Sequence, residues 1–224
     1  MEEVRHGRGR TVAASVCNLL IVVFTAYSMS RFFTVGGDGN MAVMNTRCFQ
    51  YFTVDSNLLA ALASLLLLIG QLRSLGSGKQ PSRWLLVFKH VGAAAVGVTF
   101  FTVFCFLGFL YGYRSMIEGA NLFMHLLTPL LAMLGFCFLE REPLIRFRCV
   151  FLGLLPTILY GIVYITMVFV EKRWPDFYGF NIGGRWIFSC FLMVCATLLI
   201  SAALWALRRA AAGKRGKGEY RQDH

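Results

Sequence analysis

Six long apolar runs, separated by shorter polar segments, dominate the pattern of hydrophobic and polar positions along the chain. Each run is long enough to cross a lipid bilayer, which takes about 20 mostly apolar residues in a helix. We therefore predict an all-α polytopic membrane protein, a six-transmembrane-helix bundle formed by residues 1–207, followed by a basic, disordered tail, residues 208–224. The predicted spans are residues 11–31, 52–72, 84–111, 120–139, 150–170 and 186–207.

The composition agrees with a membrane location, since 57% of the residues are hydrophobic and only 15% are charged. A soluble domain of this size carries more charge and shorter apolar runs. The first run follows several basic residues, as a signal peptide would. It is longer than the roughly 7–15 apolar residues of such a peptide, and no small-x-small cleavage site follows, so we expect a retained helix.

The distribution of positive charge predicts the orientation of the bundle. The chain has 22 Lys and Arg residues and a net charge of +11. Fifteen of them lie before the first run, in the second and fourth connections and in the tail, whereas six lie in the other three connections. Because Lys and Arg are retained on the cytoplasmic side, we predict that both termini are cytoplasmic. The basic tail then serves orientation and contact with anionic lipids, and no nucleic-acid partner is expected.

Metal and cofactor sites are not expected. The seven cysteines contain no C-x-x-C pair, and six of them fall in or beside apolar runs, where Cys acts as a small hydrophobic residue. Haem ligation by His90 and His125 together is disfavoured, because the predicted topology puts them near opposite membrane faces. For Lys89 and His90 we expect side chains that extend toward the headgroups.

Two pairs of polar residues stand inside the apolar runs at helical spacing. Thr53 and Asn57 form one pair, and Asn121 and His125 form the other, each four residues apart and so on one helix face. Both pairs fall near the non-cytoplasmic start of their spans. His125 lies about 6–8 Å deeper than Asn121, from a rise of about 1.5 Å per residue. The two faces could therefore meet in one pocket.

Such a pocket would permit acyl-transfer chemistry. A threonine hydroxyl becomes a nucleophile when a base removes its proton, and a neutral imidazole can do so, which makes Thr53 and His125 the candidate catalytic pair. Asp55 could orient the histidine, although it points to a different side of its helix. Three further side chains could support the pocket or stabilise an oxyanion: Ser56, Asn57 and Asn121.

Structural roles compete with each of these assignments. A threonine in a membrane helix commonly bonds the carbonyl one turn back, and asparagines commonly bridge helices. A histidine deep within a span is rarer and more often functional. The long fifth connection, rich in aromatic residues and glycine, could cover the pocket or form an interfacial belt. Its candidate lid or substrate-pocket residues are Trp174, Pro175, Asp176, Tyr178 and Arg185.

Three blocks of the sequence resemble the androgen-induced and androgen-dependent TFPI-regulating membrane proteins and their bacterial six-span relatives. The blocks are "YFTVDSNLLAAL", "NLFMH" with a following proline, and "RWPDFYGFNIGGRWIF". Animal members are threonine hydrolases that cleave fatty acid esters of hydroxy fatty acids. The resemblance implies that Thr53 is the nucleophile, that His125 is its partner and that the protein lies in a bacterial plasma membrane. Asp55 and the proline are each displaced by one place from the family pattern.

The leading hypothesis is therefore an intramembrane hydrolase of a lipid ester, with membrane lipids as its surroundings and no cofactor. The alternative is a non-catalytic sensor or carrier that binds a lipid or small molecule in the same pocket.

Overall fold

The computed structural model describes residues 2–34, 44–77, 80–140 and 144–219, and within these ranges it contains helices and no strand. Six helical stretches of the described chain are long and apolar enough to cross a membrane, which confirms the predicted six-helix architecture. They are Arg8–Phe33, Phe52–Gly76, Arg83–Tyr111, Ala120–Leu139, Phe147–Val170 and Trp186–Gly213.

Single α-helices form the first, second and sixth stretches, and a long α-helix followed by shorter helices forms the third, while the fourth and fifth contain several short helices. The long α-helices are α1 (Glu2–Phe33), α2 (Phe52–Ser77), α3 (Arg83–Thr102) and α9 (Trp186–Glu219). The third stretch continues through η2 (Val103–Leu107) and α4 (Gly108–Tyr111). The fourth contains α6 (Ala120–Leu122), η3 (Phe123–Leu127), α7 (Thr128–Leu134) and η4 (Gly135–Leu139). The fifth contains η5 (Phe147–Leu154), α8 (Leu155–Ile165) and η6 (Thr166–Val170). Short connecting helices are η1 (Asn45–Gln50), α5 (Tyr113–Met116) and η7 (Ile182–Gly184).

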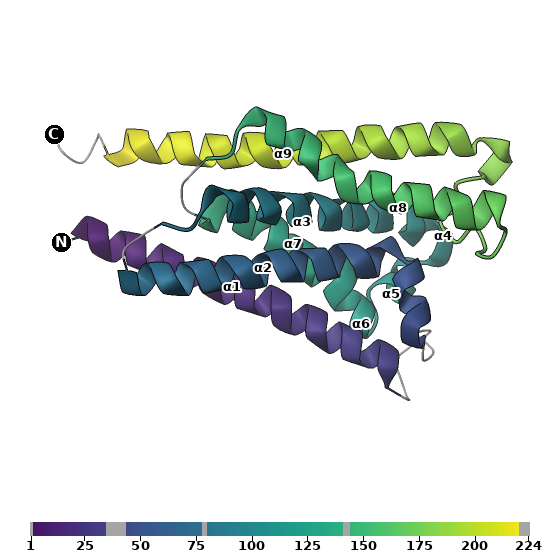
Figure 1. Ribbon diagram of the computed structural model, residues 1–224, viewed down its shortest axis with the longest axis horizontal. Coiled ribbons are helices and arrows are strands. Elements are labelled where there is room, and N and C mark those ends of the chain that lie inside the picture. Colours follow the sequence, from purple (N-terminus) through teal and green to yellow (C-terminus); the bar gives the residue numbers. More distant parts are fainter. Residues whose placement is uncertain (1, 35–43, 78–79, 141–143, 220–224) are drawn as a thin grey trace.

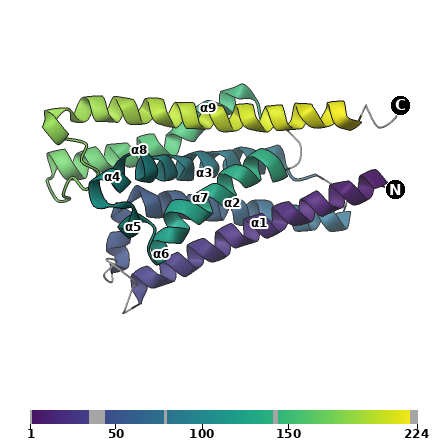
Figure 2. The ribbon, with the colours of Figure 1, turned by 180° about the vertical axis from the view of Figure 1, so that it is seen from behind.

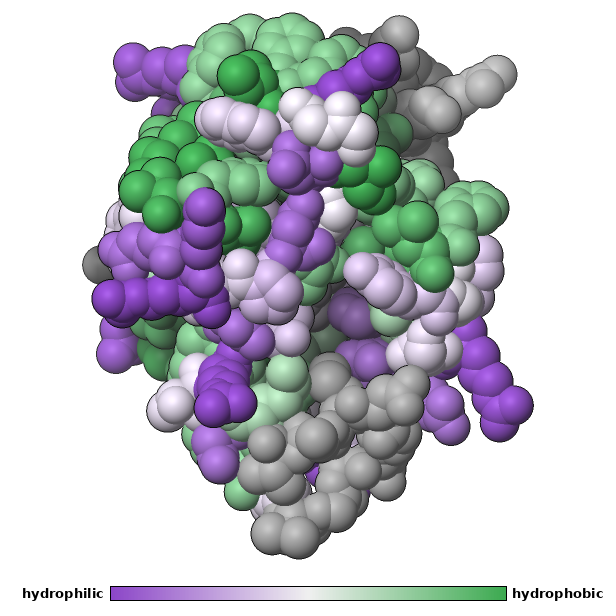
Figure 3. Space-filling view, turned by 90° about the vertical axis from the view of Figure 1, so that its right-hand side faces the viewer, coloured by the Kyte–Doolittle hydropathy of each residue, from purple (hydrophilic) through white to green (hydrophobic). Residues whose placement is uncertain are grey.

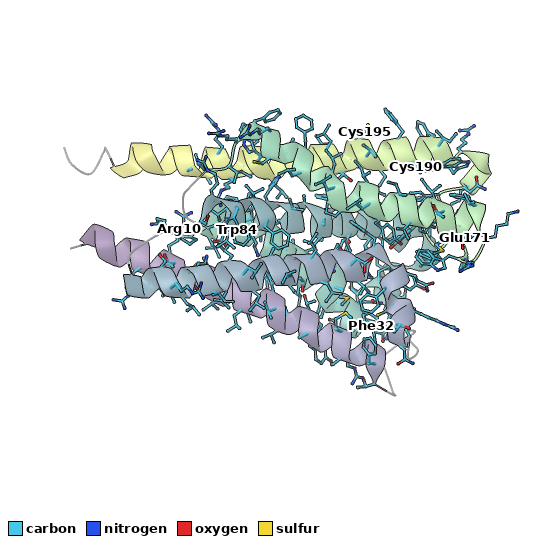
Figure 4. All side chains as sticks on the ribbon, viewed as in Figure 1. Arg10, Phe32, Trp84, Glu171, Cys190 and Cys195 are labelled. Atoms are coloured by element: carbon cyan, nitrogen blue, oxygen red, sulfur yellow. The ribbon has the colours of Figure 1, made fainter. Side chains whose placement is uncertain are left out.

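The six stretches run alternately up and down, so the described parts nearest the two termini lie at the same end of the bundle (Figure 1). Figure 2 shows the same arrangement from behind. We call this the terminal end, and we call the opposite end, which holds η1, α5 and residues 171–185, the loop end. Labelled side chains identify the two ends in Figure 4. Arg10 and Trp84 lie at the terminal end, and Phe32 and Glu171 lie at the loop end.

The core is centred on α3. Within its most apolar window 56% of the residues are buried, against 17% for α9 at the periphery, whose exposed apolar side chains suit contact with lipid. A run of small residues, Gly92 to Ala95, lets α3 approach α2 closely. A Cβ atom at Gly92 would lie 2.9 Å from the Cα atom of Ala60. Close backbone approach through small residues is how membrane helices gain packing without a hydrophobic driving force.

Buried polar side chains join four helical segments toward the terminal end. The Lys89 ammonium group donates to Asn18 Oδ1 at 2.7 Å and to Ser64 Oγ at 2.6 Å. Asn18 in turn donates to Glu140 Oε1 at 2.8 Å, and Gln71 donates to Glu140 Oε2 at 2.6 Å. This network links α1, α2 and α3 to the residue that follows η4, because a buried charge must find donors, acceptors and a counter-charge inside the protein.

The expectation that Lys89 and His90 extend toward the headgroups is wrong. Lys89 is 1% exposed and belongs to the buried network, while His90 is fully buried and its Nε2 lies 2.9 Å from Ser201 Oγ. Both side chains point to neighbouring helices, where polar partners are available, rather than to the membrane surface.

The predicted boundary of the tail at residue 208 is also wrong, because α9 continues to Glu219. Arg208 is buried and donates to the carbonyl oxygen of Phe136 at 2.7 Å, and its guanidinium lies 4.9 Å from the centre of the Phe136 ring. The start of the basic segment therefore packs against η4 and forms part of the bundle.

Replacing Lys89 by alanine should destabilise the bundle strongly, because the buried side chains of Asn18 and Ser64 would lose the ammonium group that joins them. We expect a loss of about 3 kcal/mol, because two buried hydrogen bonds to a charged group are removed. Thermal unfolding in detergent measures it. Arg83→Ala on the same helix is the matched control and should cost less than about 0.5 kcal/mol, since Arg83 is exposed. Equal effects of the two substitutions would contradict the proposed role of the network.

Candidate functional site

A proline determines the backbone hydrogen bonding around His125. In the π-helical segment η3 the N–H group of Thr128 donates to the carbonyl of Phe123, so it does not reach the carbonyl of Met124. The next donor in π-helical register would be residue 129, which is proline and has no N–H group. The Met124 carbonyl instead accepts a hydrogen bond from Asn57 Nδ2 of α2 at 3.0 Å. Asn57 thus replaces the donor that Pro129 lacks.

The same amide group ties both predicted catalytic helices together. Asn57 Nδ2 also donates to the carbonyl oxygen of Thr53, at 2.7 Å. The backbones of Thr53 and of Met124, the neighbour of His125, are therefore bridged by one side chain. Both N–H groups of Asn57 are used in this bridge, so its amide has no hydrogen left for an oxyanion. The geometry of Asn57 therefore supports a role as a bridge between helices and not as an oxyanion donor.

Thr53 lines a small cavity at the loop end, about 50 Å³ in volume. Figure 3 views this end of the molecule, where hydrophilic residues lie scattered among hydrophobic ones. The hydroxyl-bearing residues around the cavity are Thr53, Thr99, Thr102, Thr157, Tyr160, Tyr164 and Tyr178. Within the described ranges, Thr53 Oγ1 makes no hydrogen bond. Thr197 does bond the carbonyl four residues earlier, but Thr53 sits in the first turn of α2, where its own helix offers no such carbonyl.

The imidazole of His125 is held in one tautomer. Its Nδ1 lies 2.6 Å from the carbonyl oxygen of Met116, which can only accept, so Nδ1 carries the proton. The neutral ring therefore presents Nε2 as a base. Within the described chain Nε2 has no hydrogen-bond partner, and the residue is 8% exposed. A backbone carbonyl thus orients this histidine as a carboxylate does in a catalytic triad.

No direct hydrogen bond joins Thr53 and His125 in this conformation, and His125 is not among the residues that line the Thr53 cavity. The two residues are linked through Asn57. Their cooperation as a dyad stays a prediction, and it requires the side chains to approach when an ester binds, as catalytic hydrogen bonds often do.

The remaining polar candidates of α2 and α6 have other partners. Ser56 Oγ lies 2.8 Å from Thr99 Oγ1 and connects α2 to α3. Asn121 Nδ2 donates to the carbonyl of Ser115 at 3.0 Å, which fastens α6 to the short third connection. Asp55 lines a different feature, a groove between α2 and α8, so it does not orient His125.

The fifth connection folds over the cavity through Asp176 and Tyr178. The Asp176 carboxylate accepts hydrogen bonds from the Tyr164 hydroxyl at 2.7 Å and from the backbone N–H groups of Phe180 and Asn181. The Tyr178 hydroxyl accepts from the N–H group of Phe52 at 2.9 Å, at the start of α2. Burial raises the pKa of Tyr178 to about 12, which keeps this hydroxyl protonated.

Of the predicted residues of this connection, Tyr178 lines the cavity, and the others lie outside it. Trp174 lines the groove between α2 and α8, while Pro175 and Arg185 are exposed. Two tyrosines of α8, Tyr160 and Tyr164, line the cavity and were not predicted. Their spacing of four residues in "LYGIVYI" was the available signal, since it puts both rings on one helix face.

Metal binding finds no support in the described parts of the chain, where no group of three or more His, Cys, Asp or Glu side chains could hold an ion. No known protein family, no curated protein and no solved structure matches the chain. The resemblance of the three sequence blocks therefore stays a prediction, and the site has to be interpreted from its own chemistry.

The Asn57 bridge can be tested by a double-mutant cycle with Pro129. Asn57→Ala should cost about 1–3 kcal/mol of stability, because the buried Met124 carbonyl loses its donor. Pro129→Ala returns an N–H group to the helix, so the same Asn57→Ala substitution should cost clearly less in that background. Thermal unfolding of the four proteins in detergent measures both costs. Equal costs in the two backgrounds would contradict the compensation.

Asp176→Ala should loosen the fifth connection, because it removes three hydrogen bonds at once. We expect faster amide hydrogen exchange over residues 177–185 and a stability loss of about 1–3 kcal/mol. Glu171→Ala is the matched control, since Glu171 pairs with Arg173 at 2.8 Å on the exposed surface, where ion pairs contribute little. Unchanged exchange in the Asp176 variant would refute its anchoring role.

Proposed function

We propose that the protein is an intramembrane hydrolase of a lipid ester, with Thr53 as the nucleophile and His125 as the general base. The observation that carries this proposal is the hydrogen bond from His125 Nδ1 to the Met116 carbonyl, which leaves Nε2 as a free base in the neutral ring. Further support comes from the uncommitted hydroxyl of Thr53 on a mainly apolar cavity. An unpaired base and an unpaired hydroxyl on bridged helices are the parts that acyl transfer needs.

The reaction would follow the usual two steps. Thr53 Oγ1 forms a bond to the ester carbonyl carbon while its proton passes to His125 Nε2, and the tetrahedral intermediate then releases the alcohol, which takes that proton. A water molecule next attacks the acyl-threonine, giving its proton to His125 and releasing the acid as Thr53 regains its hydrogen. A cavity of about 50 Å³ accommodates the ester group alone, so the acyl chains would extend beyond it, into lipid.

The orientation and compartment belong to the same proposal. The predicted cytoplasmic termini would put the loop end at the outer leaflet of a bacterial plasma membrane. The ester would then reach Thr53 sideways from that leaflet.

A fluorophosphonate probe in native membranes tests the proposal. Labelling should be absent in Thr53→Ala and at least about 100-fold slower in His125→Ala, since general-base catalysis contributes factors of this size. Thr102→Ala is the matched control, because Thr102 lines the same cavity and should label normally. Labelling that persists in Thr53→Ala, or folded protein that never labels, would overturn the assignment.

A non-catalytic lipid or small-molecule binder is the second candidate, favoured by one observation. Both N–H groups of Asn57 are committed to backbone carbonyls, so the best-placed amide does not form an oxyanion hole. If the protein only binds lipid, we expect the lipid to co-purify unhydrolysed and to remain bound in Thr53→Ala.

A further inference from the structure

A groove between α2 and α8 is a second feature of the loop end, separate from the Thr53 cavity. Its volume is about 350 Å³, within the range of small-molecule sites. Phe52 and Tyr160 line both features, so their two rings, 5.1 Å apart, stand between the groove and the cavity. Because both helices belong to stretches that can span a membrane, a lipid can reach this groove from the side.

One carboxylate lies in this otherwise mainly apolar groove. Asp55, in the first turn of α2, is half-buried and lines it together with the rings of Phe49, Phe52, Tyr160 and Trp174. Its side chain makes no hydrogen bond or ion pair with any residue that the structure describes. Charged groups at membrane depth are costly unless they are paired, so a carboxylate kept here calls for a cation from outside the protein.

The surroundings of Asp55 favour one kind of cation. An ammonium group is attracted by a carboxylate and also by the faces of aromatic rings. Asp55 begins its span, so it lies near the depth of lipid headgroups, and the apolar wall of the groove continues from it along α8. A simple metal ion would gain nothing from that apolar wall, whereas an amphiphile would bury its chains there.

We propose that this groove binds a membrane phospholipid with an ammonium headgroup, its ammonium beside Asp55 and an acyl chain along α8. The binding is independent of ester hydrolysis at Thr53, because it uses a different side chain and involves no covalent step. It also gives the fifth connection a second role, since Trp174 closes one side of the groove.

Photo-crosslinking in vesicles tests the proposal with two probes. Phosphatidylethanolamine and phosphatidylglycerol, with the same diazirine-bearing acyl chain, are each incorporated at trace level into vesicles of an uncharged glycosyl diacylglycerol, which has no ammonium group and no diazirine. Crosslinks are mapped to peptides of α2 and α8. We expect phosphatidylethanolamine to label the groove about tenfold more than phosphatidylglycerol, a ratio that corresponds to about 1.4 kcal/mol.

Two variants and one control complete the experiment. Asp55→Asn keeps the size of the side chain and should abolish the headgroup preference, whereas Leu159→Trp, at the exposed side of the groove, should reduce crosslinking by both probes. Glu118→Gln removes an exposed carboxylate at the same end and should change neither the headgroup preference nor the amount of crosslinking. Equal labelling by both lipids, or a preference that survives Asp55→Asn, would overturn the proposal. Fluorophosphonate labelling of Thr53 is measured separately, so that failure of the lipid-binding proposal can be told apart from failure of the hydrolase proposal.

Discussion

The hydrogen bond from Asn57 to the Met124 carbonyl is the interaction on which the loop end of the bundle depends. A bilayer supplies no water to a carbonyl that has lost its helical donor, so the donor must come from another helix. Pro129 creates that requirement, and Asn57 of α2 meets it. This bond fastens α2 to η3 and so ties the turn that carries Thr53 to the one that carries His125.

Both ends of the bundle must provide partners for polar groups that the membrane leaves without water, and they do so in different ways. Toward the terminal end, Lys89, Asn18 and Glu140 satisfy one another through short hydrogen bonds across several helices. At the loop end, aromatic rings and hydroxyl groups surround a cavity and a groove, and several polar groups there remain uncommitted. Asn57 and Asn121 each keep a buried, unpaired side-chain oxygen. Unpaired buried polar groups lower the stability of a protein, and proteins usually keep them only at functional sites.

The number and type of helices could be predicted because length and apolarity alone decide whether a segment can span a bilayer. Which side of a helix faces a partner could not be predicted in the same way. Lys89 illustrates the difference: hydropathy gave its depth, but its partners Asn18 and Ser64 come from two other helices. The helical spacing of Thr53 and Asn57 did indicate a shared face. Their separate roles depend on Pro129 and on the π-helical register of η3, which spacing does not reveal.

Lys89 also imposes an order of events during synthesis. Lys89 is synthesised about fifty residues before Glu140, a delay of several seconds at about 5–20 residues per second. During that interval the ammonium group has only the neutral partners Asn18 and Ser64, which precede it in the chain. A lysine within a span opposes insertion, by up to about 2.5–3.5 kcal/mol at the centre and by less toward an end, where Lys89 lies. The first three helices therefore carry neutral partners for the charge before its counter-charge exists.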